Sequence, residues 1–205
     1  MRIWRTVWIT AGIAVLAAAA TTATAAAGWW TGGTTVVTNT ASANSAGANT
    51  ALSELKAGRC PANQPGTPVS DVTGTGDSMV PIAADRVLLC AYAGLDPGPG
   101  VARYGLAAQA VVTDPAKISD LRNVLNSLGN EPNGTYNCPE ATGASVLEIF
   151  GDGAHEVEVN QTLDGCQTAT NGSRARGVGT SAAGGILLSL LPPASCTSIW
   201  NRSAC

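Results

Sequence analysis

The six cysteines constrain this chain more than any other feature, because none of them precedes residue 60. The residues before them have the layout of a secretory signal, with basic Arg2 and Arg5, an apolar run over 6–20 and a small-residue end at 25–27. Export delivers cysteines to compartments in which disulfides form and persist. The sequence therefore predicts an exported, disulfide-stapled domain, secreted or held at the cell surface.

The N-terminal segment also fits an uncleaved membrane anchor. A spanning helix needs about 20 apolar residues, a length that this segment reaches only if 21–27 and Trp29–Trp30 are counted. Tryptophan favours membrane–water interfaces, which supports the anchor. We expect residues 1–27 to be a signal peptide or, alternatively, this anchor, so that the chain meets a membrane only there.

Composition divides the rest of the chain into a linker and a domain. Residues 28–49 carry no charge and are mostly Thr, Ala, Asn, Ser and Gly, a composition that buries too little apolar surface to order itself. We expect a flexible linker over 28–58, with a short helical turn within 50–57, and a single α+β domain over 59–205.

Hydrophobic periodicity predicts the elements of that domain. Strands are expected at 86–92, 104–113, 145–150, 155–163 and 174–178, and helices at 115–128 and 181–191. The uniformly apolar 86–92 is typical of a central strand buried on both faces. This order favours a small antiparallel sheet with one or two helices packed on one face.

Local sequence indicates where the two helices begin and end. Asp114 before Pro115 is a favoured start, and Gly129 is suited to a left-handed C-terminal cap. Ser181 is expected to cap the second helix. Asn171-Gly172 predicts a tight turn.

The cysteine spacing favours disulfides over a metal site. Zinc sites use close ligand pairs, whereas no two cysteines here are closer than nine positions and His155 is the only histidine. Six cysteines allow fifteen pairings. We expect Cys138 with Cys166 around a hairpin, Cys196 with Cys205, and Cys60 with Cys90, with no metal and no cofactor.

A few residues could carry hydrolytic chemistry. His155 could act as a base for Ser78 or Ser181, although a solvent-facing hairpin residue is the simpler interpretation. Carboxyl groups also gather on the hairpin, and paired carboxylates can hydrolyse glycosides. They are Glu148, Asp152, Glu156 and Glu158. Because 156 and 158 share one face of a strand, we expect that pair on a solvated sheet surface.

Parts of residues 60–172 resemble a group of uncharacterised secreted actinobacterial proteins. The resemblance is carried by 86–92 (RVLLCAY), 118–128 (ISDLRNVLNSL), Cys138-Pro139, 163–166 (LDGC) and Asn171-Gly172. It implies export and no particular activity.

The segment from Cys138 to Cys166 also resembles the subtilisin-inhibitor family, in which a Cys-Pro opens the reactive loop and a strand pair leads to the partner cysteine. The resemblance implies a reactive loop formed by Pro139, Glu140, Ala141 and Thr142, with Glu140 offered to the protease. The family's other disulfide has no equivalent here.

These observations predict a non-catalytic binding module of the cell envelope or extracellular space, whose partner is an extracellular protein or envelope component. The alternatives are a protease inhibitor that presents the loop after Cys138 and a secreted hydrolase that uses His155. Nucleic acid is not expected as a partner, because the net charge is −3 and no basic block occurs.

Overall fold

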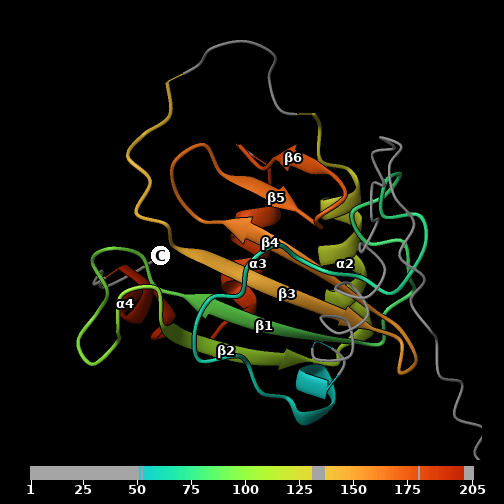
Figure 1. The fold of residues 1–205 in the computed structure, drawn as a ribbon, viewed down its shortest axis with the longest axis horizontal. Helices are drawn as coiled ribbons and strands as arrows, with labels where there is room; N and C mark the ends of the chain where they lie inside the picture. The colour runs from blue at the N-terminus through green and yellow to red at the C-terminus, as the bar shows by residue number, and fades with distance from the viewer. Residues whose placement is uncertain (1–50, 52, 131–136, 180, 201–205) are drawn as a thin grey trace, which may run out of the picture. The chain divides into compact units, whose positions relative to one another are not determined.

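A six-stranded antiparallel sheet organises the chain (Figure 1). The computed structural model describes residues 51, 53–130, 137–179 and 181–200. The strands, in the sheet order β2-β1-β3-β4-β5-β6, are β1 (Arg86–Tyr92), β2 (Leu106–Val112), β3 (Ser145–Gly151), β4 (Glu156–Thr162), β5 (Thr168–Thr170) and β6 (Ala175–Gly177). The helices are α2 (Pro115–Asn126), α3 (Ala183–Leu190) and α4 (Ser195–Trp200). The predicted α+β class with an antiparallel sheet is confirmed.

Strand β1 is the central strand that the apolar run predicts. It pairs with β2 on one side and β3 on the other. Side chains at 87, 89 and 91 enter the larger of two hydrophobic clusters, and those at 88, 90 and 92 enter the smaller one. Burying one large apolar side chain contributes about 1.5–3 kcal/mol, so β1 stabilises the layers on both faces of the sheet.

The sheet is covered on both faces, whereas helices were expected on only one. Residues of α2, α3 and α4 belong to the larger cluster, and Figure 1 shows α3 behind the sheet. On the opposite face, Ala51 and Leu55 pack into the smaller cluster at 1% and 3% exposure. Residues 53–57 are helical. The packed part of the chain therefore includes residues that the sequence analysis assigned to the 28–58 linker.

Helix α2 begins as predicted and ends earlier than predicted. The Asp114 carboxylate accepts hydrogen bonds from the backbone N–H groups of Ala116 and Lys117, and Pro115 opens the helix. Gly129 does not adopt the predicted left-handed conformation. The last helical residue is Asn126, whose side chain bonds to a distant segment, and the hydroxyl of the following residue, Ser127, donates to the Val124 carbonyl.

The C-terminal half contains two elements that periodicity did not predict, β5 and α4. Strand β5 has only three residues and pairs with β4 and β6. The turn predicted at Asn171-Gly172 joins β5 to β6, and Gly172 has φ 82°. Helix α3 starts close to the predicted place, and the Ser181 hydroxyl accepts from the N–H of Ala183 at 3.3 Å.

Two disulfides link β1 and the hairpin to neighbouring loops. They join Cys60 to Cys90 and Cys138 to Cys166, with Cα–Cα distances of 5.5 and 4.9 Å. Both are pairs that the sequence analysis expected. The third expected pair includes Cys205, which lies outside the described residues.

The N-terminal predictions also fall outside the described residues, since both the 1–27 leader and the linker up to residue 50 are not among them. Within the described part of the chain, no helix has the length and hydrophobicity needed to cross a membrane.

Candidate functional site

His155 lies at the exposed end of the β3–β4 hairpin, as the simpler interpretation predicted. Its side chain is 52% exposed, and Nδ1 lies 3.5 Å from a carboxylate oxygen of Asp152. The other Asp152 oxygen accepts the N–H groups of Ala154 and His155, and these bonds lower the pKa of Asp152. Asp152 therefore holds the turn.

The two candidate serines are engaged elsewhere. The Ser78 hydroxyl donates to the Asn126 amide oxygen at 2.8 Å, and the Ser181 hydroxyl accepts the N–H of Ala183 at the start of α3. Among the described residues, no hydrogen bond joins His155 to either serine. The geometry thus lacks the nucleophile–base contact that a hydrolase needs.

Glu156 and Glu158 are buried, so the expected solvated surface is wrong. Their exposed fractions are 0% and 6%. Residues 69–71 cover them by running along the edge of β4: the N–H of Val69 donates to Oε2 of Glu158 at 2.8 Å, and the N–H of Glu156 donates to Asp71 at 2.9 Å. Burial, with Asp71 and Glu158 as nearby charges, raises the pKa of Glu156 to about 7, and burial raises that of Glu158 to about 7.

Glu148 is separated from that pair by the sheet. It is directly opposite Leu89 and Val159, which belong to the larger cluster under the helices. It has no exposed surface and no hydrogen-bond partner on either carboxyl oxygen. Burial alone raises its pKa to about 8. The hairpin carboxyls therefore do not meet in one cleft, and no three metal-ligand residues come together among those described.

The loop from Cys138 to Thr142 is the most exposed of the predicted sites. Residues 138–141 are exposed and have no regular secondary structure, and Thr142 is half-buried. Figure 1 shows this segment in gold outside the sheet, before the chain enters β3. All four predicted reactive-loop residues, Pro139 to Thr142, lie in it.

Both ends of this loop are fixed. The disulfide to Cys166 holds its start. At its end, the Thr142 hydroxyl donates to the Asp164 carboxylate, and the Thr142 carbonyl accepts the N–H of Leu95 at 2.9 Å. Gly165 lies beneath the middle, where a Cβ would come within 2.8 Å of the Ala141 Cβ. The loop is therefore exposed to solvent and also fixed at both ends.

Two exposed apolar side chains lie beside this loop, and the sequence analysis missed both. Leu95 is 39% exposed and bonds to Thr142 through its backbone. Tyr104 is 44% exposed, and its ring lies against Gly143. Tyr104 is also the only non-glycine residue with positive φ among those described, at 57°, a conformation that marks strained or functional positions. No periodic pattern could have indicated them, because both lie in irregular segments.

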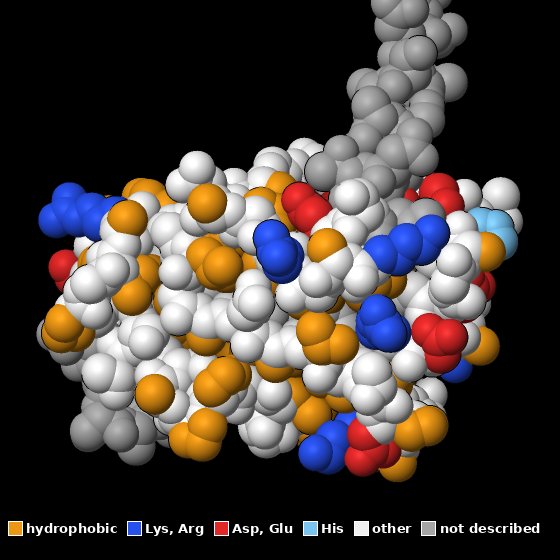
Figure 2. All heavy atoms as spheres, turned by 90° about the horizontal axis from the view of Figure 1, so that it is seen from below, with side chains coloured by type: hydrophobic (Ala, Val, Ile, Leu, Met, Phe, Trp, Pro, Cys, Tyr) orange, Lys and Arg blue, Asp and Glu red, His pale blue; other side chains and the backbone are white. Residues whose placement is uncertain are grey.

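The face of the molecule drawn in Figure 2 carries charges of both signs. Figure 2 shows a face on which Lys and Arg side chains are interspersed with Asp and Glu, and hydrophobic side chains are scattered among polar ones. This agrees with the absence of a basic block from the sequence.

Comparison with known proteins gives no relative, since the chain has no significant match to any protein-family model, curated protein or solved structure.

Proposed function

We propose that this protein is an exported, non-catalytic binding module that binds an extracellular protein or envelope component through the loop Cys138–Thr142 and the adjacent Leu95 and Tyr104. One observation carries the proposal: an exposed loop is fixed at both ends, by a disulfide and by Thr142. A loop that is ordered before binding loses less conformational entropy on association.

The neighbouring side chains supply the apolar contact that such a surface needs. Leu95 and Tyr104 are large and partly exposed. Tyrosine is enriched at the energetic centres of protein interfaces. The loop and these two side chains together form the surface that we assign to the partner.

Site-specific photo-crosslinking tests this surface in cells that produce the protein. A photoreactive residue at Glu140, on the loop, is compared with one at Asp120, an exposed position of α2. We expect a discrete crosslinked species from position 140 alone. The same species from both positions, or none from position 140, would contradict the proposal.

Export is part of the same proposal, supported by the leader layout and by two disulfides. Mass spectrometry of the protein recovered from the medium tests it. We expect a chain that begins close to Gly28. A full-length chain held in the membrane would instead favour the anchor, and a reduced full-length chain in the cytoplasm would refute export.

Protease inhibition is the second candidate, and the braced loop specifically favours it. If Glu140 is the residue that enters the specificity pocket of the protease, that pocket must accept an acidic side chain. We expect tight inhibition of a glutamate-specific serine endopeptidase and weak inhibition of subtilisin, with inhibition lost in Glu140→Ala and kept in Asp120→Asn. Rapid cleavage after Glu140 without inhibition would dismiss this candidate and leave the binding module standing.

A further inference from the structure

A cavity of about 210 Å³ lies at a different place from the loop. The helical segment 53–57, the loop after Cys60 and strand β4 contribute its walls. Pro61, Pro65 and Val69 supply apolar surface, and Glu54 and Glu158 supply carboxyl groups. At about 30 Å³ for each water, the volume corresponds to about seven waters, which is the size of a small organic molecule.

Glu158 has a carboxyl oxygen available to a ligand in this cavity. The side chain is 94% buried, since its exposed fraction is 6%. Oε2 accepts the N–H of Val69 at 2.8 Å, and no hydrogen bond to Oε1 occurs within the described residues. Oε1 is not among the fully buried oxygens that lack a partner, so a ligand can reach it. A cationic donor in the cavity would form a charge-assisted hydrogen bond with that oxygen.

Glu54 adds a second carboxyl group without a counter-charge. It lines the same cavity from the helical segment, and burial raises its pKa. Burial raises the pKa of Tyr92, and the charges of Glu54 and Glu158 raise it further, so the two carboxyls act on one phenol. In the part of the chain that the structure describes, the one ion pair is His155–Asp152, so no Lys or Arg neutralises either glutamate.

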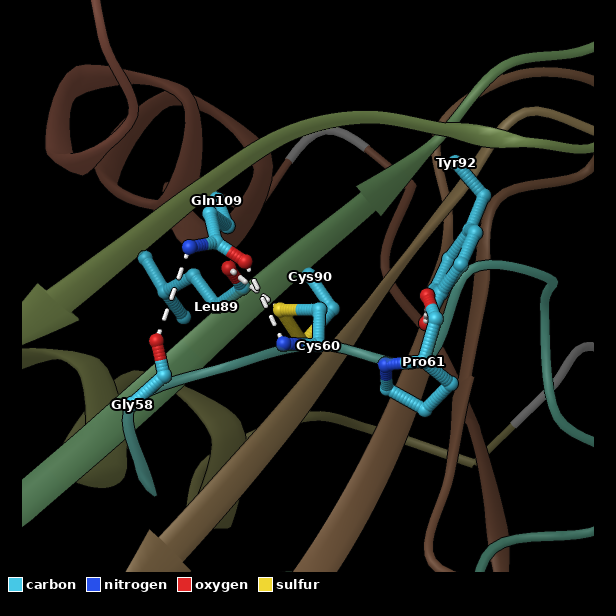
Figure 3. Close-up of a disulfide and its surroundings, with 7 residues drawn as sticks. All are labelled: Gly58, Cys60, Pro61, Leu89, Cys90, Tyr92 and Gln109. Carbon is cyan, nitrogen blue, oxygen red and sulfur yellow. Dashed lines mark hydrogen bonds between the residues drawn. A yellow bond between two sulfur atoms is a disulfide. The ribbon is translucent and has the colours of Figure 1, made fainter. Parts of the chain in front are cut away.

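The wall formed by Pro61 is rigid (Figure 3). The Cys60–Cys90 disulfide ties the preceding residue to β1, and the phenol of Tyr92 donates to the Pro61 carbonyl at 3.2 Å. The Gln109 side chain accepts the N–H of Cys60 at 3.2 Å and donates to the Gly58 carbonyl at 3.5 Å. The residues that follow the helical segment are thus held to the sheet before any ligand binds.

We propose that this cavity binds a primary alkylammonium group, free or as a lysine side chain, with the ammonium between Glu54 and Glu158 and the alkyl chain against Pro61, Pro65 and Val69. An ammonium has three donors for two carboxylates, and its aliphatic chain suits apolar walls. A metal ion fits less well, because among the described residues no three metal-ligand side chains converge.

Calorimetric titration of the full-length protein with 1,5-diaminopentane tests the site, near pH 8, which is above the pKa of about 7 at Glu158. We expect saturable binding that 1-pentanol, the neutral analogue, does not reproduce. Charge-assisted hydrogen bonds are roughly twice as strong as neutral ones, and a tenfold change in Kd corresponds to about 1.4 kcal/mol. Glu158→Gln should therefore weaken binding about tenfold or more.

Glu54→Gln keeps the test decisive if Glu158→Gln fails to fold, because Glu54 is only half-buried. We expect it to weaken binding similarly, while Asp120→Asn binds like the wild type. Equal affinity for 1-pentanol, or unchanged affinity in Glu54→Gln, would overturn the proposal. So would the absence of saturable heat with the wild type.

A second titration with Nα-acetyl-lysine methylamide distinguishes the source of the ammonium. Binding as tight as that of 1,5-diaminopentane indicates a lysine side chain of a partner, and much weaker binding indicates a free amine. Near pH 7, binding should release protons, because a bound cation favours the charged form of Glu158. The measured heat should then vary with the ionisation enthalpy of the buffer, and an invariant heat would contradict the placement of the ammonium.

Discussion

The ring of Tyr104 lies directly on Gly143. A Cβ at residue 143 would be 2.9 Å from Cε1 of that ring. Both residues have left-handed backbones, with φ 57° at Tyr104 and 86° at Gly143. Two separate loops therefore meet through one aromatic face and one residue that lacks a side chain. This contact holds the end of the Cys138–Thr142 loop beside the apolar side chains that we assign to the binding surface.

Gly143→Ala should loosen this contact. The new methyl group would require the tyrosine ring to move. In addition, a left-handed backbone conformation costs alanine about 1 kcal/mol. We expect the free energy of unfolding to fall by about 1–2 kcal/mol and the loop to be cut faster by a nonspecific protease. The control is Gly153→Ala, which has φ 89° with nothing within 4 Å. Equal protease sensitivity in the two variants would show that the contact does not order the loop.

Glu148 should make the protein more stable in mild acid than in base. Its folded-state pKa of about 8 lies above the ordinary 4.5, so the folded state holds the proton more tightly than the unfolded state. The resulting stability is fully present below about pH 4.5 and is lost as the pH rises towards 8. Urea unfolding near pH 5 and pH 8 measures this loss.

Glu148→Gln removes that pH dependence, because an amide stays neutral. The free energy of unfolding should therefore fall less between pH 5 and pH 8 in the variant than in the wild type. We expect the two falls to differ by on the order of a few kcal/mol. Part of the wild-type slope should remain, since the pKa values of Glu156 and Glu158 are also raised, to about 7. An unchanged slope in Glu148→Gln would show that this carboxyl is not buried in its neutral form.

The two disulfides should differ in their resistance to reduction. Cys138 is exposed, whereas Cys90 is fully buried in the smaller hydrophobic cluster. A thiolate reductant must reach a sulfur atom to attack it. We expect Cys138–Cys166 to be reduced first under native conditions, as measured by alkylation and mass spectrometry. Simultaneous loss of both bonds would mean that reduction requires global unfolding.

Cys138→Ser/Cys166→Ser should lower stability. In the chain-entropy model, closing a loop of this size contributes about 3 kcal/mol, so the melting temperature should fall by several degrees. The Cys60–Cys90 bond, which this variant keeps, should hold the protein folded. A melting temperature equal to that of the wild type would indicate that the exposed disulfide does not restrict the unfolded chain.

Asn126→Ala should destabilise the end of α2. The Asn126 amide accepts the Ser78 hydroxyl and the N–H of Val80, both at 2.8 Å, and donates to the Val80 carbonyl at 3.0 Å. Since Val80 is fully buried, its N–H would lose its partner, at a cost of about 1–3 kcal/mol, whereas its carbonyl would keep the bond from Nε of Arg122 at 3.2 Å. The matched control on the same helix is Asn123→Ala, which loses one exposed bond to Ser119. Equal melting temperatures for the two variants would contradict this role of Asn126.

The sequence by itself determined the elements whose stability depends on nearby residues. The apolar run 86–92 is β1 residue for residue, and Asp114-Pro115 opens α2. The hairpin follows from an apolar run before a Gly-Asp-Gly turn and an alternating strand after it. In each case the spacing of apolar residues along the chain indicates which side chains are buried, and therefore whether the segment is a strand or a helix.

Only the tertiary structure decided the features that depend on distant segments. Glu156 and Glu158 look like surface residues along β4, yet residues 69–71, more than 80 positions earlier, bond to them and cover them. The Asn126 side chain at the end of helix α2 bonds to the backbone of Val80, 46 positions earlier. The burial and the hydrogen-bond partners of a residue depend on what packs against it. A local sequence pattern does not show which distant segment folding brings beside that residue.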